Sequence, residues 1–428
     1  MITSEEFFKE LRFQLEKGLP FVAYRKPVVP NSPGVIKAFL QKDPELYSTT
    51  DYLESGFVFA PFDEKEPAIL IPGEFSDYLE TTFNNSETSK LSKITDPGNS
   101  ENSLEKEKHI KLVQKGIDSI KNKSFKKVVL SRKEIIQIPA STKPEPIEIF
   151  RDLTEKYPEA FAYIWFHPKV GLWLGATPET LLEVERNRYK TMALAGTQKY
   201  EGTLDVNWGE KEKEEQQFVT DSILEDLKPI SNKIEITSPY TAKAGGLLHL
   251  KTDISCTDAE FRVSTDSDSE SHISGADAEF RVSSDSDLES HISGADAEFR
   301  VSTEAGNMKK LIMALHPTPA VCGLPKAPAK KFILENENYN REFYTGFLGE
   351  LNLKKTVQRS SNRKNRENQA YASITKTSAL FVNLRCMKLE DNKAVLFVGG
   401  GITKDSDPVA EWEETSNKAQ TMKRVLFK

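Results

Sequence analysis

The chain has 428 residues, of which 38% are hydrophobic and 29% charged, with a formal net charge of −7. This length is enough for one large or two ordinary domains with a real core. It contains no run of about eighteen apolar residues, which excludes a membrane-spanning helix. Cys256, Cys322 and Cys386 are odd in number and widely spaced, which argues against a disulfide framework or a zinc site. We therefore expect a cytoplasmic protein with no membrane contact.

The N-terminal part mixes one helix with short strands. Residues 1–19 predict an amphipathic helix with Phe7, Leu11 and Leu15 on one face, and its mixed charges argue against a secretory signal. The stretches "SGFVFAPF" and "PAILIPG" predict strands. Residues 84–108 are polar and poor in aromatic residues, which predicts a linker or exposed loop. We expect residues 1–105 to pack as an N-terminal part on a catalytic body formed by residues 106–428.

The catalytic body opens with a helix and continues with strands. In residues 109–122 the apolar positions share a helix face, residues 125–138 are rich in β-branched residues, and residues 161–197 predict strands separated by turns. A helix is expected over 208–228, ended by Pro229, and another from 308 is broken at His316-Pro317. Residues 377–402 predict a hairpin around Glu390-Asp391-Asn392. A last helix begins after Asp407, a suitable N-cap, with Pro408 at its first position.

Two segments of biased charge interrupt the body. Residues 257–302 hold twelve Asp or Glu and three Arg, a local charge of −9, so the remainder carries only about +2. Residues 354–376 hold seven Lys or Arg and one Glu, a local charge of +6. We expect both to be insertions, the basic one a long hairpin loop. Nucleic-acid binding by that loop is disfavoured because Tyr371 is its only aromatic residue.

The acidic insertion contains a tandem repeat. "DAEFRVS" begins at Asp258, Asp277 and Asp296, a period of nineteen residues. Each unit offers few apolar residues, whereas a solenoid needs a continuous apolar face across its units. We expect a flexible, acidic surface insertion. The alternative is calcium binding by the Asp-Ser-Asp runs, although no liganding loop with its turn glycine is present.

Two single residues predict acid–base chemistry. Lys127 begins the strand "KVVLSR", where burial would lower the pKa of its amine and create a general base; a strand-end lysine reaching solvent is the alternative. Glu179 follows a Gly-Ala-Thr-Pro turn in an apolar run, where burial would raise its pKa and create a general acid; a solvated turn carboxylate is the alternative. A base and an acid kept apart by environment form a recognisable catalytic pattern.

Two glutamate pairs predict a metal site. Glu212 and Glu215 are three residues apart on one expected helix, and Glu411 and Glu414 are three apart on the last helix, so each pair shares a face. If the two faces meet, the like charges require a divalent cation, and all-oxygen ligation suits Mg²⁺. The alternative is a solvated charge run, which is strong for "GEKEKEEQQ" and weaker for the second pair.

From Ile110 to the C-terminus the chain resembles the chorismate-utilising enzymes. The ordered motifs are "KVVLSR", "LGATPETLL", "LAGT", "LHPTPAVCGLP", "NREFYTGFLGE", "FVNLRC", "GGGI" and "PVAEWEETSNK". The resemblance implies an α+β fold with large antiparallel sheets packed in a sandwich and helices outside. Hairpin-like strand pairs without strict βαβ alternation agree with this fold class.

The resemblance also separates the subfamilies. Ammonia-using members typically lack a lysine at the position of Lys127, and aminodeoxychorismate synthases commonly carry a lysine where this chain has Ala195. Both differences imply that water is the nucleophile. An isochorismate synthase of menaquinone or siderophore type is therefore expected first and a salicylate synthase second. A non-catalytic chorismate binder disabled by its insertions is a further alternative.

The resemblance assigns roles to individual residues. Lys127 would activate the water that attacks C2 of chorismate, and Glu179 would protonate the leaving C4 hydroxyl. Arg385 would bind the pyruvyl carboxylate with its guanidinium fork. The remaining expected substrate-binding residues are Gly196, Thr197, His249, Tyr344, Gly399 (in a triple-glycine turn) and Lys418. Mg²⁺ would be held by Glu215 and Glu414, with Glu212 and Glu411 directly or through water. Chorismate is the only expected partner, and we expect a monomer.

Overall fold

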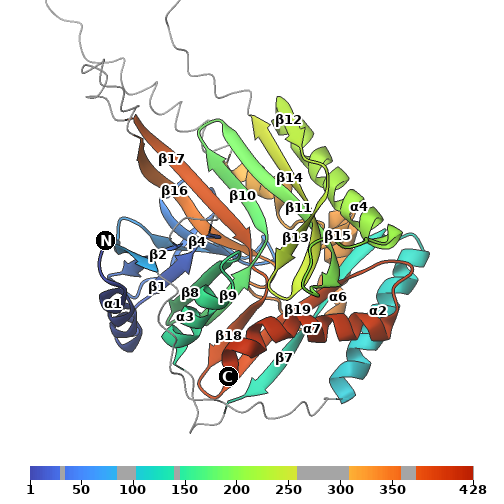
Figure 1. The fold of residues 1–428 in the computed structure, drawn as a ribbon, viewed down its shortest axis with the longest axis horizontal. Helices are drawn as coiled ribbons and strands as arrows, with labels where there is room; N and C mark the ends of the chain where they lie inside the picture. Colours follow the sequence, from blue (N-terminus) through green and yellow to red (C-terminus); the bar gives the residue numbers. More distant parts are fainter. Residues whose placement is uncertain (29–33, 84–102, 139–144, 258–307, 358–372, 428) are drawn as a thin grey trace, which may run out of the picture.

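The structure is a computed structural model that describes residues 1–28, 34–83, 103–138, 145–257, 308–357 and 373–427 (Figure 1). At its centre are two antiparallel sheets. The nine-stranded sheet has the order β15 (Gly323–Leu324), β7 (Lys127–Gln137), β19 (Lys393–Ile402), β18 (Cys386–Glu390), β9 (Gly171–Thr177), β8 (Phe161–His167), β1 (Phe21–Arg25), β2 (Gly34–Gln41), β6 (Ser76–Phe83).

The ten-stranded sheet has the order β12 (Lys233–Ile236), β14 (Leu247–Thr257), β11 (Arg188–Lys199), β10 (Thr180–Glu185), β17 (Ser373–Val382), β16 (Phe347–Val357), β4 (Gly56–Ala60), β5 (Ala68–Pro72), β3 (Tyr47–Thr49), with β13 (Tyr240–Ala244) beside β14. The helices are α1 (Ser4–Glu16), α2 (Ser103–Lys121), α3 (Pro146–Lys156), α4 (Glu210–Leu227) with the 3₁₀ turn η2 (Lys228–Ile230), a helix at 308–315, α6 (Lys326–Asn336) and α7 (Pro408–Leu426). Among the described residues, no helix is long and apolar enough to cross a membrane.

The central strands bury both of their faces, and period-two alternation sorts their side chains into two layers. On β8, Phe161 and Trp165 point into an aromatic layer between the sheets, whereas Ile164 points to the helices outside. Phe161 stacks on Phe381 of the opposite sheet with 4.2 Å between ring centroids. Such stacked aromatic side chains contribute large buried area and fix how the two sheets face each other.

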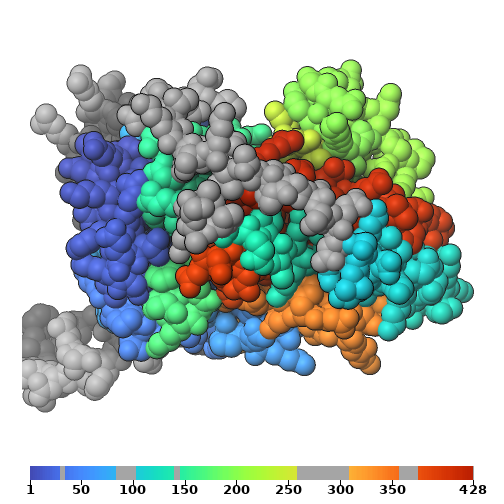
Figure 2. Space-filling view, turned by 90° about the horizontal axis from the view of Figure 1, so that it is seen from below, coloured from blue at the N-terminus to red at the C-terminus, as the bar shows by residue number. Residues whose placement is uncertain are grey.

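Helices cover the outer faces of both sheets, which confirms the expected α+β sandwich. Helices α1, α3 and α7 share a core with the nine-stranded sheet, and α4 and the helix at 308–315 share one with the ten-stranded sheet. Helices α2 and α6 pack with the start of β7 in a fourth cluster. Figure 2 shows α2 in cyan beside the orange segment that contains α6.

The N-terminal strands are integral to the sandwich. Strand β1 pairs with β8, and β4 pairs with β16, so residues 1–83 contribute strands to both sheets. The predicted helix at the N-terminus is present as α1, with Thr3 and Glu6 forming a capping box. Phe7 and Leu11 are buried as expected. At the other end, α7 begins after the predicted N-cap Asp407, whose carboxylate accepts from the backbone of Val409 and Ala410.

Two sequence predictions about loops require correction. The linker expected over 84–108 ends sooner, because α2 begins at Ser103. Glu and Lys are good helix formers, and the Glu105–Lys108 pair at 2.8 Å supports the first turns. The basic segment 354–376 is a hairpin as expected, but its arms are strands: β16 runs to Val357, which pairs with Ser373 of β17. Residues 358–372 and the acidic repeat 258–302 lie outside the described residues.

The expected triple-glycine turn is a strand. Gly399, Gly400 and Gly401 lie within β19 and pair with Ser131, Leu130 and Val129 of β7. The cause is their surroundings: buried neighbours leave no room for side chains along this strand, as the site geometry below shows. The sequence "LAGT" forms a bulge in β11 rather than a turn, with the register shifting between Ala195 and Gln198 and Gly196 at φ +70°.

Candidate active site

One pocket collects nearly all the predicted site residues. It is bounded by β7 and β19 of one sheet, β11 and β14 of the other, and the helices α4 and α7. Of the predicted residues, Glu411 alone does not line it. The predicted residues that line it are Lys127, Glu179, Gly196, Thr197, Glu212, Glu215, His249, Tyr344, Arg385, Gly399, Glu414 and Lys418.

Lys127 stands at the first position of β7 and is only 3% exposed. Its Nζ pairs with Glu215 Oε1 of α4 at 2.7 Å. The pair crosses the backbone of Gly401: a Cβ built there would lie 2.6 Å from Glu215 Oε1 and 3.0 Å from Lys127 Cε. Glycine at this point of β19 is therefore what allows the lysine to reach the glutamate. The alternative of a strand-end lysine reaching solvent does not fit this burial.

Glu179 lies in the short connection between β9 and β10 and is also 3% exposed. Burial raises the pKa of its carboxyl to about 7, although a hydrogen bond from Thr318 and the charges of Lys127 and Arg385 oppose the increase. The Thr318 hydroxyl donates to Glu179 Oε1 at 3.3 Å. A carboxyl with this pKa is substantially protonated near neutral pH, so it can act as a proton donor.

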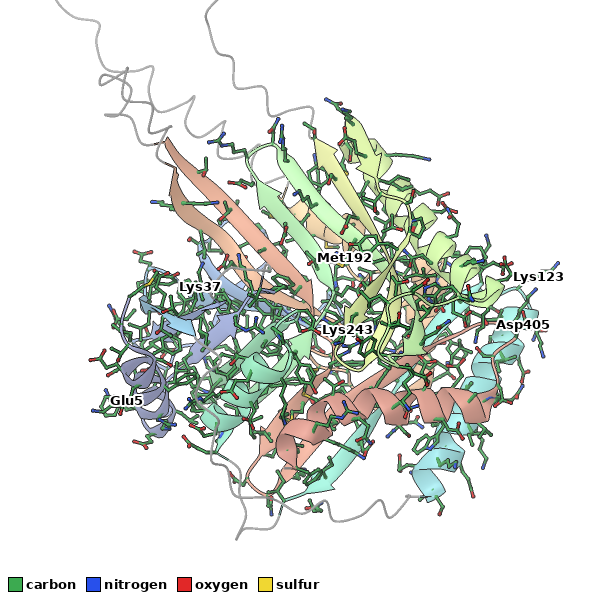
Figure 3. All side chains as sticks on the ribbon, viewed as in Figure 1. Glu5, Lys37, Lys123, Met192, Lys243 and Asp405 are labelled. Atoms are coloured by element: carbon green, nitrogen blue, oxygen red, sulfur yellow. The ribbon has the colours of Figure 1, made fainter. Side chains whose placement is uncertain are left out.

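Arg385 is held in the pocket by two partners. Its guanidinium donates to the carbonyl of Ala244, which follows Lys243 at the end of β13 (Figure 3), and to His249 Nε2 at 2.8 Å. Arginine has only donors, so His249 Nε2 accepts and its Nδ1–H donates to Gly196 O at 2.8 Å. Burial and the charge of Arg385 lower the pKa of His249 to about 3, which keeps the imidazole neutral. Arg385 lines the pocket as well.

Lys418 and Tyr344 line the wall beside Gly399. Lys418 Nζ donates to Gly399 O at 3.0 Å and pairs with Glu414 at 2.7 Å, one turn earlier on α7. The Tyr344 hydroxyl lies 3.0 Å from where a Cβ of Gly399 would stand, so a larger residue there would displace it. The wall therefore combines a lysine ammonium, a tyrosine hydroxyl and a strand without side chains.

The four predicted metal-binding carboxylates come from α4 and α7. Glu215 and Glu414 line the pocket, each paired with a lysine. Glu411 lies behind Gly400, and its Oε2 would be 3.1 Å from a Cβ built on that glycine. Glu212 also lines the pocket. Its Oε2 would lie 2.6 Å from a Cβ built on Gly209, the residue just before α4. Over the described ranges, no three His, Cys, Asp or Glu side chains are placed to hold a metal as they stand.

The donor chemistry nevertheless fits a hard divalent cation. Burial and the neighbouring Glu414 raise the pKa of Glu411 to about 7, and its buried Oε2 has no hydrogen-bond partner. Burial acts to raise the pKa of Glu414 as well, but the charge and hydrogen bond of Lys418, with the charges of Lys211 and Lys127, together outweigh burial and lower that pKa. Lys418 therefore balances the charge of Glu414, whereas at Glu411 the charges of Lys211 and Lys418 do not outweigh burial. A cation bound by the same oxygens would take over that role.

Sequence reasoning missed several residues that line the pocket or contact a residue in it. Thr318, which contacts Glu179, lies in the quoted motif "LHPTPAVCGLP" without having been singled out. Lys211 lines the pocket, and its Nζ lies 3.7 Å from Glu411 Oε1. In the sequence it belongs to a charged run that resembles a solvated helix face. The apolar lining of Val129, Val321 and Phe397 gives no signal beyond strand periodicity. The three cysteines are free and buried, as expected of packing residues.

The comparisons with known proteins identify the family of the chain. The model of the chorismate binding enzyme family matches residues 70–264, 299–359 and 370–427. This is well over half of the chain, so the chain belongs to the chorismate binding enzyme family. The family resemblance read from the sequence motifs is thereby confirmed.

Individual relatives are distant. Isochorismate synthase EntC of Escherichia coli K12 is 26% identical over 70% of this chain and 62% of its own length, so the match spans less than two thirds of that relative. Isochorismate synthase DhbC of Bacillus subtilis is 23% identical over 86% of this chain and 79% of its own length. The solved structure of DhbC from Bacillus anthracis superposes with a TM-score of 0.66 at 20% identity, covering 97% of this chain and 98% of that one. That likeness confirms the fold.

Proposed function

We propose that the protein is an isochorismate synthase that converts chorismate to isochorismate with water as nucleophile. The observation that supports it most is one pocket holding a buried lysine and a buried carboxyl with a raised pKa. Its family membership and the isochorismate synthases among its relatives point the same way. Ala195 also lines this pocket, where aminodeoxychorismate synthases commonly carry a lysine.

The proposed reaction exchanges one hydroxyl for another. In its neutral amine form, with the charge of Glu215 taken up by the proposed cation, Lys127 accepts a proton from the water that attacks C2. The ring double bond then shifts, and the C4–O bond breaks. Glu179 gives its proton to the departing hydroxyl, which leaves as water. One water enters and one leaves, so the net change is isomerisation. The buried acid and base each contribute in the range of 10²–10⁴-fold that is usual for positioned groups.

The substrate is a dianion, and the pocket offers cationic groups for it. Arg385 is fixed by Ala244 and His249, so its fork can bind the pyruvyl carboxylate without losing much conformational freedom. Lys418 and the neighbouring Gly399, with Gly196 and Thr197 across the pocket, line the space for the ring. Tyr344 contributes a hydroxyl beside Gly399.

Magnesium is part of the proposal. Glu215 and Glu414 would hold it, with Glu212 and Glu411 directly or through water. When bound there, Mg²⁺ supplies positive charge that neutralises and orients the ring carboxylate. The support from this chain is an all-oxygen donor set and the unpartnered, buried Oε2 of Glu411.

The test is to incubate the purified protein with chorismate and Mg²⁺ and resolve the products by chromatography. Isochorismate alone is the expected result. Salicylate with pyruvate would instead identify a salicylate synthase. Chorismate that binds but stays unchanged would overturn the proposed activity and identify a binding protein.

A further inference from the structure

A buried ion pair next to the pocket belongs to neither the proposed base nor the proposed acid. Arg341 and Glu337 follow α6, and their side chains are 2% and 1% exposed. Arg341 Nε donates to Glu337 Oε2 at 2.7 Å, and its NH2 donates to Glu337 Oε1 at 2.6 Å. Removing water from two charges is costly, so a buried pair is retained only where its geometry and further hydrogen bonds are good.

The arginine uses all five of its N–H groups. Beyond the two donated to Glu337, NH1 donates to Val321 O and to Thr345 Oγ1, both at 3.1 Å, and NH2 donates to Val129 O at 2.7 Å. Val129, Val321 and Thr345 all line the pocket. One side chain outside the pocket therefore ties together three segments of its wall.

The glutamate extends the network along β7. Glu337 Oε1 accepts from the backbone N–H of Ser131 at 2.7 Å and from its hydroxyl at 3.0 Å. Strand β7 is thus held at Val129 and Ser131, just after Lys127. Alternation along the strand places Lys127 and Val129 on the same face, toward the pocket.

The same network reaches Thr318, the residue that contacts the proposed acid Glu179. Val321 N and Cys322 N both donate to Thr318 O, at 3.0 Å, so these residues form one tight turn. Arg341 fixes this turn through Val321 O, and Thr318 in the turn donates to Glu179 Oε1. The guanidinium consequently bridges the strand of Lys127 and the turn that contacts Glu179.

We propose that the Arg341–Glu337 pair is a positioning device that sets the proposed base Lys127 and the proposed acid Glu179 in register across the substrate. The inference rests on the proposed function. Neither side chain lines the pocket, so the pair makes no direct contact with the substrate and acts through the position of the pocket wall. Displacing reacting groups by about 1 Å can cost about 10²-fold in rate.

The experiment compares Arg341→Lys and Glu337→Gln with a matched control, Glu350→Gln. Glu350 is an equally buried carboxylate that pairs with Lys37 at 3.0 Å and accepts from the Tyr24 hydroxyl at 2.7 Å, and it does not line the pocket. Lysine keeps the charge of Arg341 but not its five-donor fork. We expect kcat, calculated per folded molecule, to fall about 10²-fold in Arg341→Lys and in Glu337→Gln. The KM of both variants should stay within about 3-fold of the wild-type value.

Thermal unfolding and hydrogen exchange complete the test. The control is expected to lose stability while keeping kcat, which separates positioning from stability. Unchanged kcat in folded Arg341→Lys, or an equal loss of kcat in Glu350→Gln, would overturn the inference. Should Arg341→Lys not fold, Ser131→Ala removes the hydroxyl bond to Glu337, together with the bond between the Ser131 and Tyr339 hydroxyls at 2.6 Å, and should lower kcat several-fold. Unchanged kcat would count against the pair.

A turnover-free readout separates this inference from the proposed function. Amide exchange at residues 127–131 and 318–322 should accelerate together in Arg341→Lys and stay unchanged in Glu350→Gln. If wild-type protein makes no isochorismate, the proposed function fails, whereas the coupling of these two segments is still tested. Independent exchange of the two segments would overturn the positioning role in either case.

Discussion

At the residue scale, burial determines the chemistry of the pocket. Glu179 and Glu411 are both buried carboxyls whose pKa is raised to about 7, but different neighbours surround them. Glu179 faces Thr318 and the cations Lys127 and Arg385, whereas Glu411 sits beside another carboxylate, Glu414. The first environment suits a proton donor, and the second suits a group that a cation would ionise.

The raised pKa of Glu179 predicts a pH-dependent stability. A carboxyl whose folded-state pKa is raised stabilises the fold fully below its unfolded pKa, near 4.5, and loses this contribution as pH rises through about 7. Glu179→Gln cannot ionise. The comparison is the free energy of unfolding of the wild type minus that of Glu179→Gln. We expect this difference to fall by about 3 kcal/mol as the pH rises from 4.5 to 8. Urea unfolding across this range measures it, and a constant difference would contradict the buried acid.

Lys127→Ala should separate catalysis from binding. The variant removes the proposed base, so we expect kcat to fall by about 10²–10⁴-fold while chorismate still binds through Arg385 and Lys418. Steady-state kinetics and equilibrium binding of chorismate measure the two effects. The adjacent lysine, Lys126, is exposed and supplies the control Lys126→Ala, which should keep full turnover. Retained turnover in Lys127→Ala would exclude its role as base.

At the scale of elements, α7 and α4 bring the acidic groups to the pocket from opposite sides of a glycine strand. The three-residue spacing within each helix could be read from the sequence, because helix periodicity depends only on local order. The sequence did not predict that Glu411 lies against Gly400 and Glu215 against Gly401. These contacts depend on the pairing of β19 with β7, which joins segments far apart in the chain. A run of three glycines favours a turn by local rules, and tertiary contact overrides them here.

Helix α7 also offers a matched pair of variants for the metal proposal. Glu414 faces the pocket and Glu413, next to it, is exposed. Glu414→Ala removes one proposed ligand, so we expect the Mg²⁺ concentration for half-maximal activity to rise at least tenfold. Glu413→Ala should leave it unchanged. Direct Mg²⁺ binding by calorimetry gives a second readout, and equal titrations for wild type and Glu414→Ala would contradict the assignment.

At the scale of the whole molecule, the sequence predicted the architecture better than it predicted the contacts across it. The family resemblance carried by the ordered motifs implied a sandwich of antiparallel sheets, which the structure confirms. The Arg341–Glu337 network was not predictable, because it joins β7, the turn at 318–322 and the segment after α6, and no local pattern places these together. Long-range hydrogen bonds of this kind follow from the closed fold.

The acidic repeat supplies a test of how far the fold depends on its insertions. Strand β14 ends at Thr257 and the next described helix starts at residue 308, so the repeat connects two elements of the sandwich. Lengthening a surface loop costs little, about 0.6 kcal/mol for each doubling of its length. Deleting residues 258–295, two repeat units, should therefore leave the melting temperature within a few degrees of wild type and preserve turnover. A large loss of thermal stability would mean that the repeat packs against the sandwich.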